Sequence, residues 1–207
     1  MVIGVADLVP KRKELFTRAI LVDGLLATPP GFLTNLGPFV WGSRMGVSLR
    51  ALIATLVQAG FRKGEVSVPA PGSPCGPDCL SRAALTWVLR GRAYKPGTAP
   101  SHLLRCLQHS DFAVLIPCSS KADPFDVVWG GEPIWLPFQY REPLCACDDA
   151  LASLELAFFV ASAVDASSVA LFTTDAGLPF SASQLDRLLS VPLKRFLPRL
   201  HFEGEFR

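Results

Sequence analysis

The sequence of 207 residues contains few charged residues and almost no asparagine. Charged residues make up 18% of it, against roughly 25% in ordinary soluble domains, while hydrophobic residues make up 50%. A surface with so few charges must carry extra apolar area, which favours a partner protein or self-association. Asn35 is the only asparagine. Because codons for Asn, Lys, Ile and Met are rich in adenine, this bias hints at a skewed genome, and we consider a viral accessory factor that acts on a host protein.

The sequence also lacks a stretch suited to export or to a membrane span. The apolar residues 1–9 are interrupted by Asp7 and precede the basic residues 11–13, the reverse of the order in a secretory signal. Within the apolar stretch 151–172 the longest uncharged run is Leu156–Val164, nine residues, where a span needs roughly 20. These features predict a cytoplasmic or nuclear protein. Its six cysteines are then expected to be free thiols or metal ligands rather than disulfides.

Charge is distributed unevenly along the chain. Residues 1–100 contain 12 Lys and Arg against 5 Asp and Glu, whereas residues 101–207 contain 8 against 13. We divide the chain into a basic half (1–100), an acidic half (101–190) and a basic C-terminal helix (191–200), and we expect the halves to attract each other. With no internal repeat and no clear linker, residues 1–207 are predicted to form a single compact domain.

Alternating helical and strand patterns predict an α/β or α+β fold, a mixed sheet of about five to six strands with helices on both faces. The apolar run 111–116 is typical of a central strand. Helices are expected over residues 11–22, from an N-cap at Ser48 to Gly60, after Ser81, over 102–109, over 148–164 in a buried central position, after Ser181 or Ser183, and from Pro192. Strands are expected over residues 39–41, 65–68, 111–116 and 169–173, and a hairpin at a sheet edge over 126–136.

Side-chain chemistry is concentrated in residues 73–118, which contain four of the six cysteines and two of the three histidines. A helix over 102–109 would present His102, Cys106 and His109 on one face. Together with Cys75 and Cys79 of the preceding Pro/Gly-rich loop they could bind zinc, because thiolate and imidazole ligands suit that ion. The alternative is that no cofactor is bound, and that these are buried cysteines and solvent-facing histidines.

The order of elements around Pro74 and Cys75 resembles the zinc-dependent cytidine deaminase superfamily over about residues 38–118. In that family a Pro-Cys…Cys pair begins a helix, and a His or Cys ligand with a catalytic Glu begins the helix before it. Here the earlier segment reads Arg44-Met45-Gly46-Val47-Ser48, and three residues instead of two separate Cys75 from Cys79. The resemblance therefore implies a degenerate scaffold without the zinc-bound water.

A second enzymatic alternative is a thiol-dependent hydrolase. Cys79, and Cys145 of the pair Cys145 and Cys147, each precede a predicted helix, whose N-terminus could lower the pKa of a thiol. Nucleophilic catalysis also requires a base, such as one of the histidines. No flanking sequence matches a known protease signature, and no complete catalytic set is present.

Two partner surfaces are predicted instead. One is a surface for single-stranded nucleic acid, which prefers positive charge near aromatic rings. Its positive charges belong to Arg82, Arg90, Arg92 and Lys95. The other offers aromatic anchors for a protein in the predicted hairpin, namely Trp129, Trp135 and Phe138. The leading interpretation is a non-enzymatic regulatory or adaptor protein that binds another protein or itself, with nucleic-acid binding as an alternative.

Overall fold

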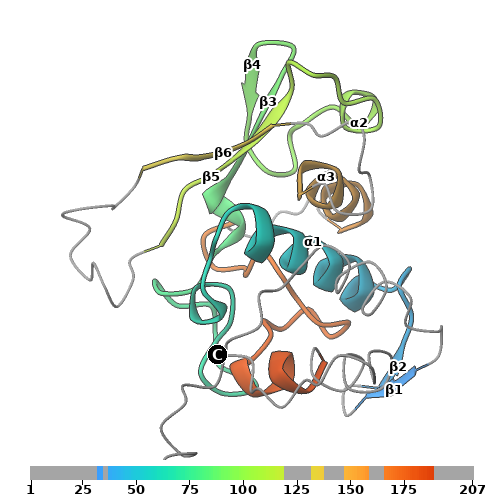
Figure 1. Ribbon diagram of the computed structural model, residues 1–207, viewed down its shortest axis with the longest axis vertical. Coiled ribbons are helices and arrows are strands. Elements are labelled where there is room, and N and C mark those ends of the chain that lie inside the picture. The colour runs from blue at the N-terminus through green and yellow to red at the C-terminus, as the bar shows by residue number, and fades with distance from the viewer. Residues whose placement is uncertain (1–31, 35–36, 119–131, 138–146, 159–165, 189–207) are drawn as a thin grey trace, which may run out of the picture.

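The computed structural model describes residues 32–34, 37–118, 132–137, 147–158 and 166–188, which form an α+β fold (Figure 1). Helix α1 (Arg44–Gln58) packs against helix α3 (Cys147–Phe158), and α3 in turn contacts a four-stranded sheet. Figure 1 shows α1 with α3 and the sheet on one side and residues 170–188 on the other. No helix in this part of the chain is long and apolar enough to cross a membrane. The elements predicted over residues 11–22, over 126–129 and from Pro192 lie outside the described residues.

The four-stranded sheet has the strand order β4-β3-β5-β6. Its strands are β3 (Leu85–Leu89), β4 (Arg92–Tyr94), β5 (Phe112–Leu115) and β6 (Ile134–Pro137), and a separate pair joins β1 (Phe32–Thr34) to β2 (Gly37–Phe39). All pairings of the four strands are antiparallel, so the prediction of a mixed sheet is wrong for the described residues. The predicted five to six strands are not confirmed. Strand β5 lies inside the sheet, as the apolar run 111–116 predicted.

Strand β3 occupies a segment whose pattern predicted a helix after Ser81. Leu85, Trp87 and Leu89 are buried while the residues between them are half-buried, which is the alternation of a strand. Apolar residues in this segment fit helical spacing equally well, but its aromatic and β-branched residues favour a strand. Only a single 3-10 turn, Arg82–Ala84, precedes β3. The helix that a deaminase-like loop should begin is therefore absent here.

A two-residue turn of Arg90 and Gly91 joins β3 to β4. Both residues have positive φ angles, 51° and 76°, as the type I′ turn of a hairpin requires. Asp111, which is fully buried, accepts hydrogen bonds from the backbone N–H groups of Arg90 and Gln108, each at 2.8 Å. It also pairs with the Arg90 guanidinium, which in addition donates to the carbonyl of Cys106 at 2.8 Å. The turn is thus fixed to the segment that precedes β5.

Helix α1 begins one turn earlier than predicted, and distant residues complete it. Its N-cap is Ser43, whose hydroxyl accepts a backbone N–H of the first turn, while the predicted cap, Ser48, is buried inside the helix. The Ser48 hydroxyl accepts the N–H of Thr173 at 2.7 Å, and the Asp175 carboxylate accepts the N–H of Met45 at 2.7 Å. The segment around Thr173 and Asp175 therefore packs on α1, and Asp175 supplies part of its N-terminal capping.

Several other predicted elements are shorter than expected. Residues 65–68 and 169–173 form isolated bridges instead of strands, Val68 with Ser181 and Ala170 with Ser81. The strand expected over 39–41 lies two residues earlier, in β2. The helix expected over 102–109 is a single turn, α2 (Ser101–Leu104). Short apolar runs thus pack into the core without regular pairing.

Three helix predictions are confirmed. Gly60, with φ of 71°, directly follows the C-cap of α1, where a left-handed residue ends a helix. The hydroxyl of Ser181 accepts the N–H of Gln184 at 3.2 Å and caps the helical residues 182–188. The described part of α3 is largely buried, including Leu151 and Leu154, as expected of a central helix.

Candidate functional site

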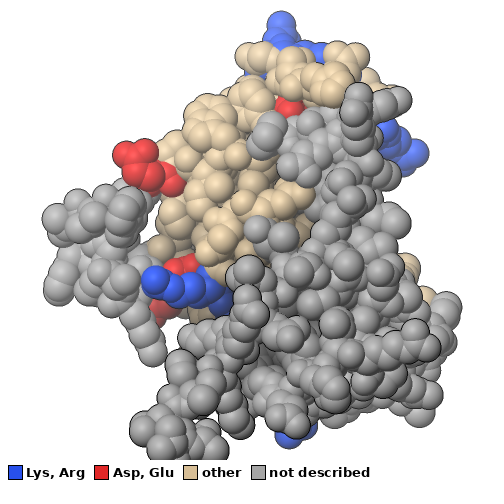
Figure 2. All heavy atoms as spheres, viewed as in Figure 1, with Lys and Arg blue, Asp and Glu red and all other residues tan. Residues whose placement is uncertain are grey.

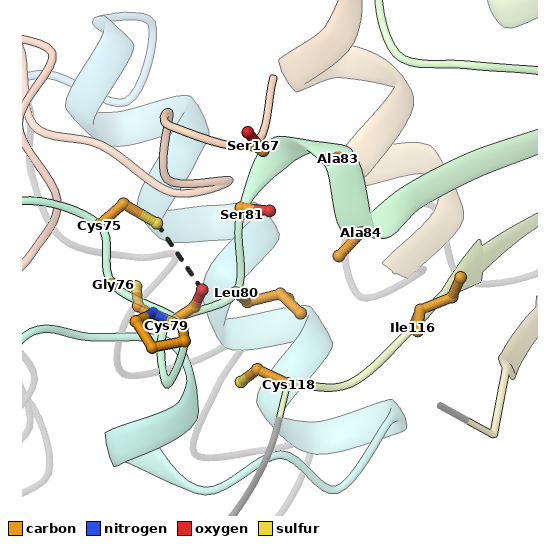
Figure 3. Close-up of a pocket in the computed structure, with 11 residues that line it drawn as sticks. Cys75, Gly76, Cys79, Leu80, Ser81, Ala83, Ala84, Ile116, Cys118 and Ser167 are labelled. Carbon is orange, nitrogen blue, oxygen red and sulfur yellow. Dashed lines mark hydrogen bonds between the residues drawn. The ribbon is translucent and has the colours of Figure 1, made fainter. Parts of the chain in front are cut away.

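Three cysteines line one pocket at the end of strand β5 (Figure 3). The pocket has a volume of about 390 Å³. Cys75 and Cys79 come from the Pro/Gly-rich loop before β3, and Cys118 lies three residues beyond the end of β5. Among the described residues, its wall contains no histidine and no carboxylate. The lining therefore combines three thiols with small and apolar residues, while the carboxylates of Glu65 and Asp78 act on Cys118 from outside it.

Two thiols of this pocket donate hydrogen bonds to backbone carbonyls, Cys75 within its own loop and Cys118 across to Asp78 and, at 3.8 Å, to Glu65. The Cys75 thiol donates to the carbonyl of Cys79 at 3.6 Å, the contact drawn in Figure 3. The Cys118 thiol donates to the carbonyl of Asp78 at 3.3 Å. Cys79 itself is only 5% exposed and interacts with the side chain of Cys75. These contacts fasten the loop to the end of β5.

The thiols are poorly suited to nucleophilic attack. Burial raises the pKa of Cys79 to about 12, and the neighbouring Cys75 adds to the rise. Burial likewise raises the pKa of Cys118 to about 11, although a backbone hydrogen bond acts in the opposite direction. The pKa of Cys75 is also raised by burial. All three thiols are therefore protonated at neutral pH, whereas the reactive form is the thiolate.

The five residues predicted to bind zinc fall into two groups. Cys75 and Cys79 are at the thiol pocket. His102 within α2, and Cys106 and His109 after it, are exposed, and Figure 1 places α2 at the far end of the sheet. The predicted helix over 102–109 ends at Leu104, so the expected common face for these three side chains is wrong. No group of three His, Cys, Asp or Glu side chains in the described residues is arranged to hold a metal ion.

Cys118 is the residue of this site that sequence reasoning missed as a candidate ligand. It lay within the cysteine-rich stretch and at the end of the predicted central strand, which were the available signals. Its approach to Cys75 depends on the loop before β3 folding back on the strand, and spacing along the chain does not reveal that. Of the other cysteine pair, Cys147 is the first residue of α3, and Cys145 lies outside the described residues.

A second candidate site is the outward face of the sheet, which we define as Thr86, Val88, Phe112, Val114, Ile116 and Trp135. The register pairs Val114 with Trp135, while Leu85 and Trp87 of the same sheet face the core. Trp135 is 58% exposed and its ring centroid lies 4.9 Å from that of Phe112. The two other predicted anchors, Trp129 and Phe138, lie outside the described residues. Val114 is only 8% exposed, so the exposed part of this face belongs mainly to Trp135 and Ile116, beside the half-buried Phe112.

The four residues predicted to contact nucleic acid are divided between surface and interior. Arg90, Arg92 and Lys95 are exposed on and beside the β3–β4 hairpin. Arg82 is 3% exposed and lies inside the molecule, close enough to Glu155 for their charges to interact. Trp87, the nearest tryptophan, is fully buried and cannot act as a stacking platform.

Comparison with known proteins finds no match for this chain among protein-family models, curated proteins or solved structures.

Proposed function

We propose that this chain is a non-enzymatic regulatory or adaptor protein that binds another protein through the outward face of its sheet. The observation that carries this proposal is the exposure of Trp135, 58%, beside Phe112 on a face without charged residues. Single exposed apolar residues are ordinary on protein surfaces, but a contiguous apolar patch usually marks an interaction site. Ile116, 44% exposed, extends the patch toward the thiol pocket, which it also lines.

The energetics of the outward face support a protein partner. Covering the exposed part of Trp135 would remove about 100 Å² of mostly apolar surface from water and contribute about 2.5 kcal/mol. Tryptophan is also the residue type most enriched among dominant interface residues. Figure 2 shows a largely uncharged tan surface over the sheet, with Asp or Glu atoms at its left edge and Lys or Arg atoms at its top and below it. In the described residues β6, which carries Trp135, forms one edge of this sheet.

The thiol pocket supports a zinc- or thiol-dependent enzyme less well. Its thiols are protonated at neutral pH because burial raises their pKa values. A thiol nucleophile requires a base within hydrogen-bonding distance, and the described wall of the pocket has no side chain of that kind. The hydrogen bonds from Cys75 and Cys118 to backbone carbonyls instead fit a structural role.

The test is photo-crosslinking from the outward face. Benzoylphenylalanine is introduced at Trp135 in one variant and at Leu178 in a matched control. Leu178 is 48% exposed and lies on the turn after residue 175, away from the sheet. After irradiation in cells that express the chain, we expect a discrete crosslinked product from position 135 and none from position 178. The mass of the product shows whether the partner is a second copy or another protein.

The proposal is further checked by Trp135→Ala. Because this side chain is mostly exposed, the substitution should leave the melting temperature nearly unchanged but abolish formation of the complex found by crosslinking. Leu178→Ala should affect neither. A Trp135→Ala protein that still binds its partner, or equal crosslinking from both positions, would contradict a role for the outward face.

A further inference from the structure

A second interaction surface follows from the charges of residues 80–118. This segment contains five Lys and Arg but a single acidic residue, Asp111. Asp111 is fully buried and is paired with Arg90, and Arg82 is buried as well. The exposed charge of the segment is therefore entirely positive. It belongs to four residues that we call the basic rim: Arg90, Arg92, Lys95 and Arg105.

The fold brings the basic rim together from two separate parts of the chain. The Arg90 guanidinium donates to the carbonyl of Cys106 at 2.8 Å, so the β3–β4 turn lies against the segment that carries Arg105. Figure 2 shows Lys and Arg side chains at the upper end of the molecule, where Figure 1 places β4 and α2. Within the described residues, Arg92, Lys95 and Arg105 have no ion-pair partner. Their charges are therefore available to an external anion.

The composition of the rim indicates which anion it fits. A protein partner would need an aromatic or apolar anchor, but the exposed large hydrophobic residues of the described chain all lie outside the rim: Val40, Ile116, Trp135 and Leu178. The phosphate backbone of a nucleic acid needs only cations at suitable positions, and arginine matches phosphate geometry well. Reading bases in a single strand would require an exposed stacking ring, whereas Trp87 is buried and Tyr94 of β4 is partly buried and packs against the core.

We propose that the basic rim binds the phosphate backbone of nucleic acid without reading its sequence. The surface is independent of the outward face of the sheet, so the two activities can be separated by mutation. Binding by Arg92, Lys95 and Arg105 neutralises three phosphates and releases their counterions. The logarithm of the affinity should then fall with the logarithm of salt concentration with a slope of about −2.7.

The experiment measures fluorescence anisotropy of a fluorescein-labelled RNA duplex of arbitrary sequence. Between about 50 and 200 mM salt we expect the affinity to fall about 40-fold. Arg92→Gln combined with Arg105→Gln should lower the affinity about tenfold or more at the lower salt concentration and make the slope shallower by about two. The matched control is Arg62→Gln with Arg187→Gln, which removes the same charge from exposed residues elsewhere and should change the affinity less than about twofold.

Several results would overturn this proposal. An equal loss of RNA affinity in the two double variants would mean that only the net charge of the protein matters. Absence of RNA binding at low salt would exclude the basic rim as a phosphate-binding surface. Poly-L-glutamate that competes as well as RNA per charge would instead indicate an acidic protein partner. If the rim double variant fails to fold, Lys95→Gln alone tests the same surface, with an expected affinity loss of about threefold or more. Trp135→Ala should leave RNA binding unchanged, whatever its effect on a protein partner.

Discussion

At the scale of single residues, two buried carboxylates fix the loops at one end of the sheet. Asp111 holds the β3–β4 turn through two backbone N–H groups and the Arg90 guanidinium. Glu155 of α3, 2% exposed, accepts the backbone N–H of Gly97 in the segment after β4. Asp111 is fully engaged, whereas one oxygen of Glu155 has no hydrogen-bond partner among the described residues. The two carboxylates should therefore respond differently to substitution and to pH.

Asp111→Ala should destabilise the fold by about 3 kcal/mol. It removes the acceptor of two backbone N–H groups and the ion-pair partner of the partly buried Arg90 guanidinium. The measurement is urea unfolding followed by tryptophan fluorescence. Asp186→Ala is the matched control, since it removes a carboxylate paired with Lys63 at 2.7 Å on the surface, where such pairs contribute about 0 to 1 kcal/mol. Similar decreases in the free energy of unfolding in both variants would show that Asp111 contributes no more to stability than a surface carboxylate.

Glu155→Gln should change how stability depends on pH. Burial raises the pKa of Glu155 above its usual range, although the Gly97 N–H and Arg82 oppose this. Since the folded pKa exceeds the unfolded one, the contribution of Glu155 to stability is present below the unfolded pKa and is lost as pH rises through the folded pKa. Relative to the wild type, the Gln variant should therefore gain in stability as pH rises above about 4 and until it passes the folded pKa, by about 1.4 kcal/mol for each unit between the two pKa values.

Urea unfolding at a series of pH values measures this difference directly. A constant difference between Glu155→Gln and the wild type would mean that the carboxyl group titrates alike in the folded and unfolded chain. A variant that loses relative stability as pH rises would mean that Arg82 and Gly97 outweigh burial.

At the scale of elements, the start of α1 is packed directly on the backbone that precedes it. A Cβ atom placed on Gly46 would lie 2.2 Å from the carbonyl oxygen of Val40 and 2.6 Å from the Cα of Trp41. Both are backbone atoms, which cannot rotate away as the end of a side chain can. Only glycine allows this crossing, and it fixes the angle at which α1 leaves the segment after β2 (Gly37–Phe39).

Gly46→Ala should therefore destabilise the protein by about 1 to 3 kcal/mol despite the better helix propensity of alanine. Gly64→Ala is the matched control, because a Cβ there meets no atom within 4 Å and its φ is not positive. That variant should lie within about 0.5 kcal/mol of the wild type. Thermal unfolding of both variants measures the effect, and an unaffected Gly46→Ala protein would mean that the start of α1 can shift without cost.

Elements were predicted correctly where the sequence pattern was compatible with one kind of secondary structure. They were predicted wrongly where the same pattern fitted both a helix and a strand. The run 111–116 was apolar throughout and is strand β5, and Gly60 ends α1 as predicted. The segment 84–89 satisfied helical and strand spacing equally, and its pairing with β5, which spacing cannot show, makes it strand β3. The N-cap of α1 was missed because Ser48 also precedes an apolar stripe, but that stripe already begins at Met45. The thiol pocket could not be predicted because it depends on a loop folding back.

At the scale of the whole molecule, the basic and acidic halves meet within a single chain. Three ion pairs of the described residues join residues 1–100 to later residues: Arg50 with Asp149, Lys63 with Asp186, and Arg90 with Asp111. The first links α1 to α3, the second links the loop after α1 to the helical residues 182–188, and the third closes the β3–β4 turn. Some basic residues of the first half therefore pair with acidic residues of the second half. The basic rim, by contrast, presents its positive charges at the surface.

The completion of α1 by Thr173 and Asp175 also constrains the order in which the chain can fold during synthesis. The ribosome makes residues 44–58 first, and the groups that bond to Ser48 and Met45 follow only 125 and 130 residues later. Until they emerge, the Met45 N–H lacks its carboxylate acceptor and the side of α1 that residues 170–188 cover stays open, even if α3 has already packed on the helix. Exposed surface of this kind is where nascent chains associate with chaperones or with one another. The first helix of the described residues is thus completed by some of the last described residues to be made, so this helix cannot reach its final packing until most of the described chain has been synthesised.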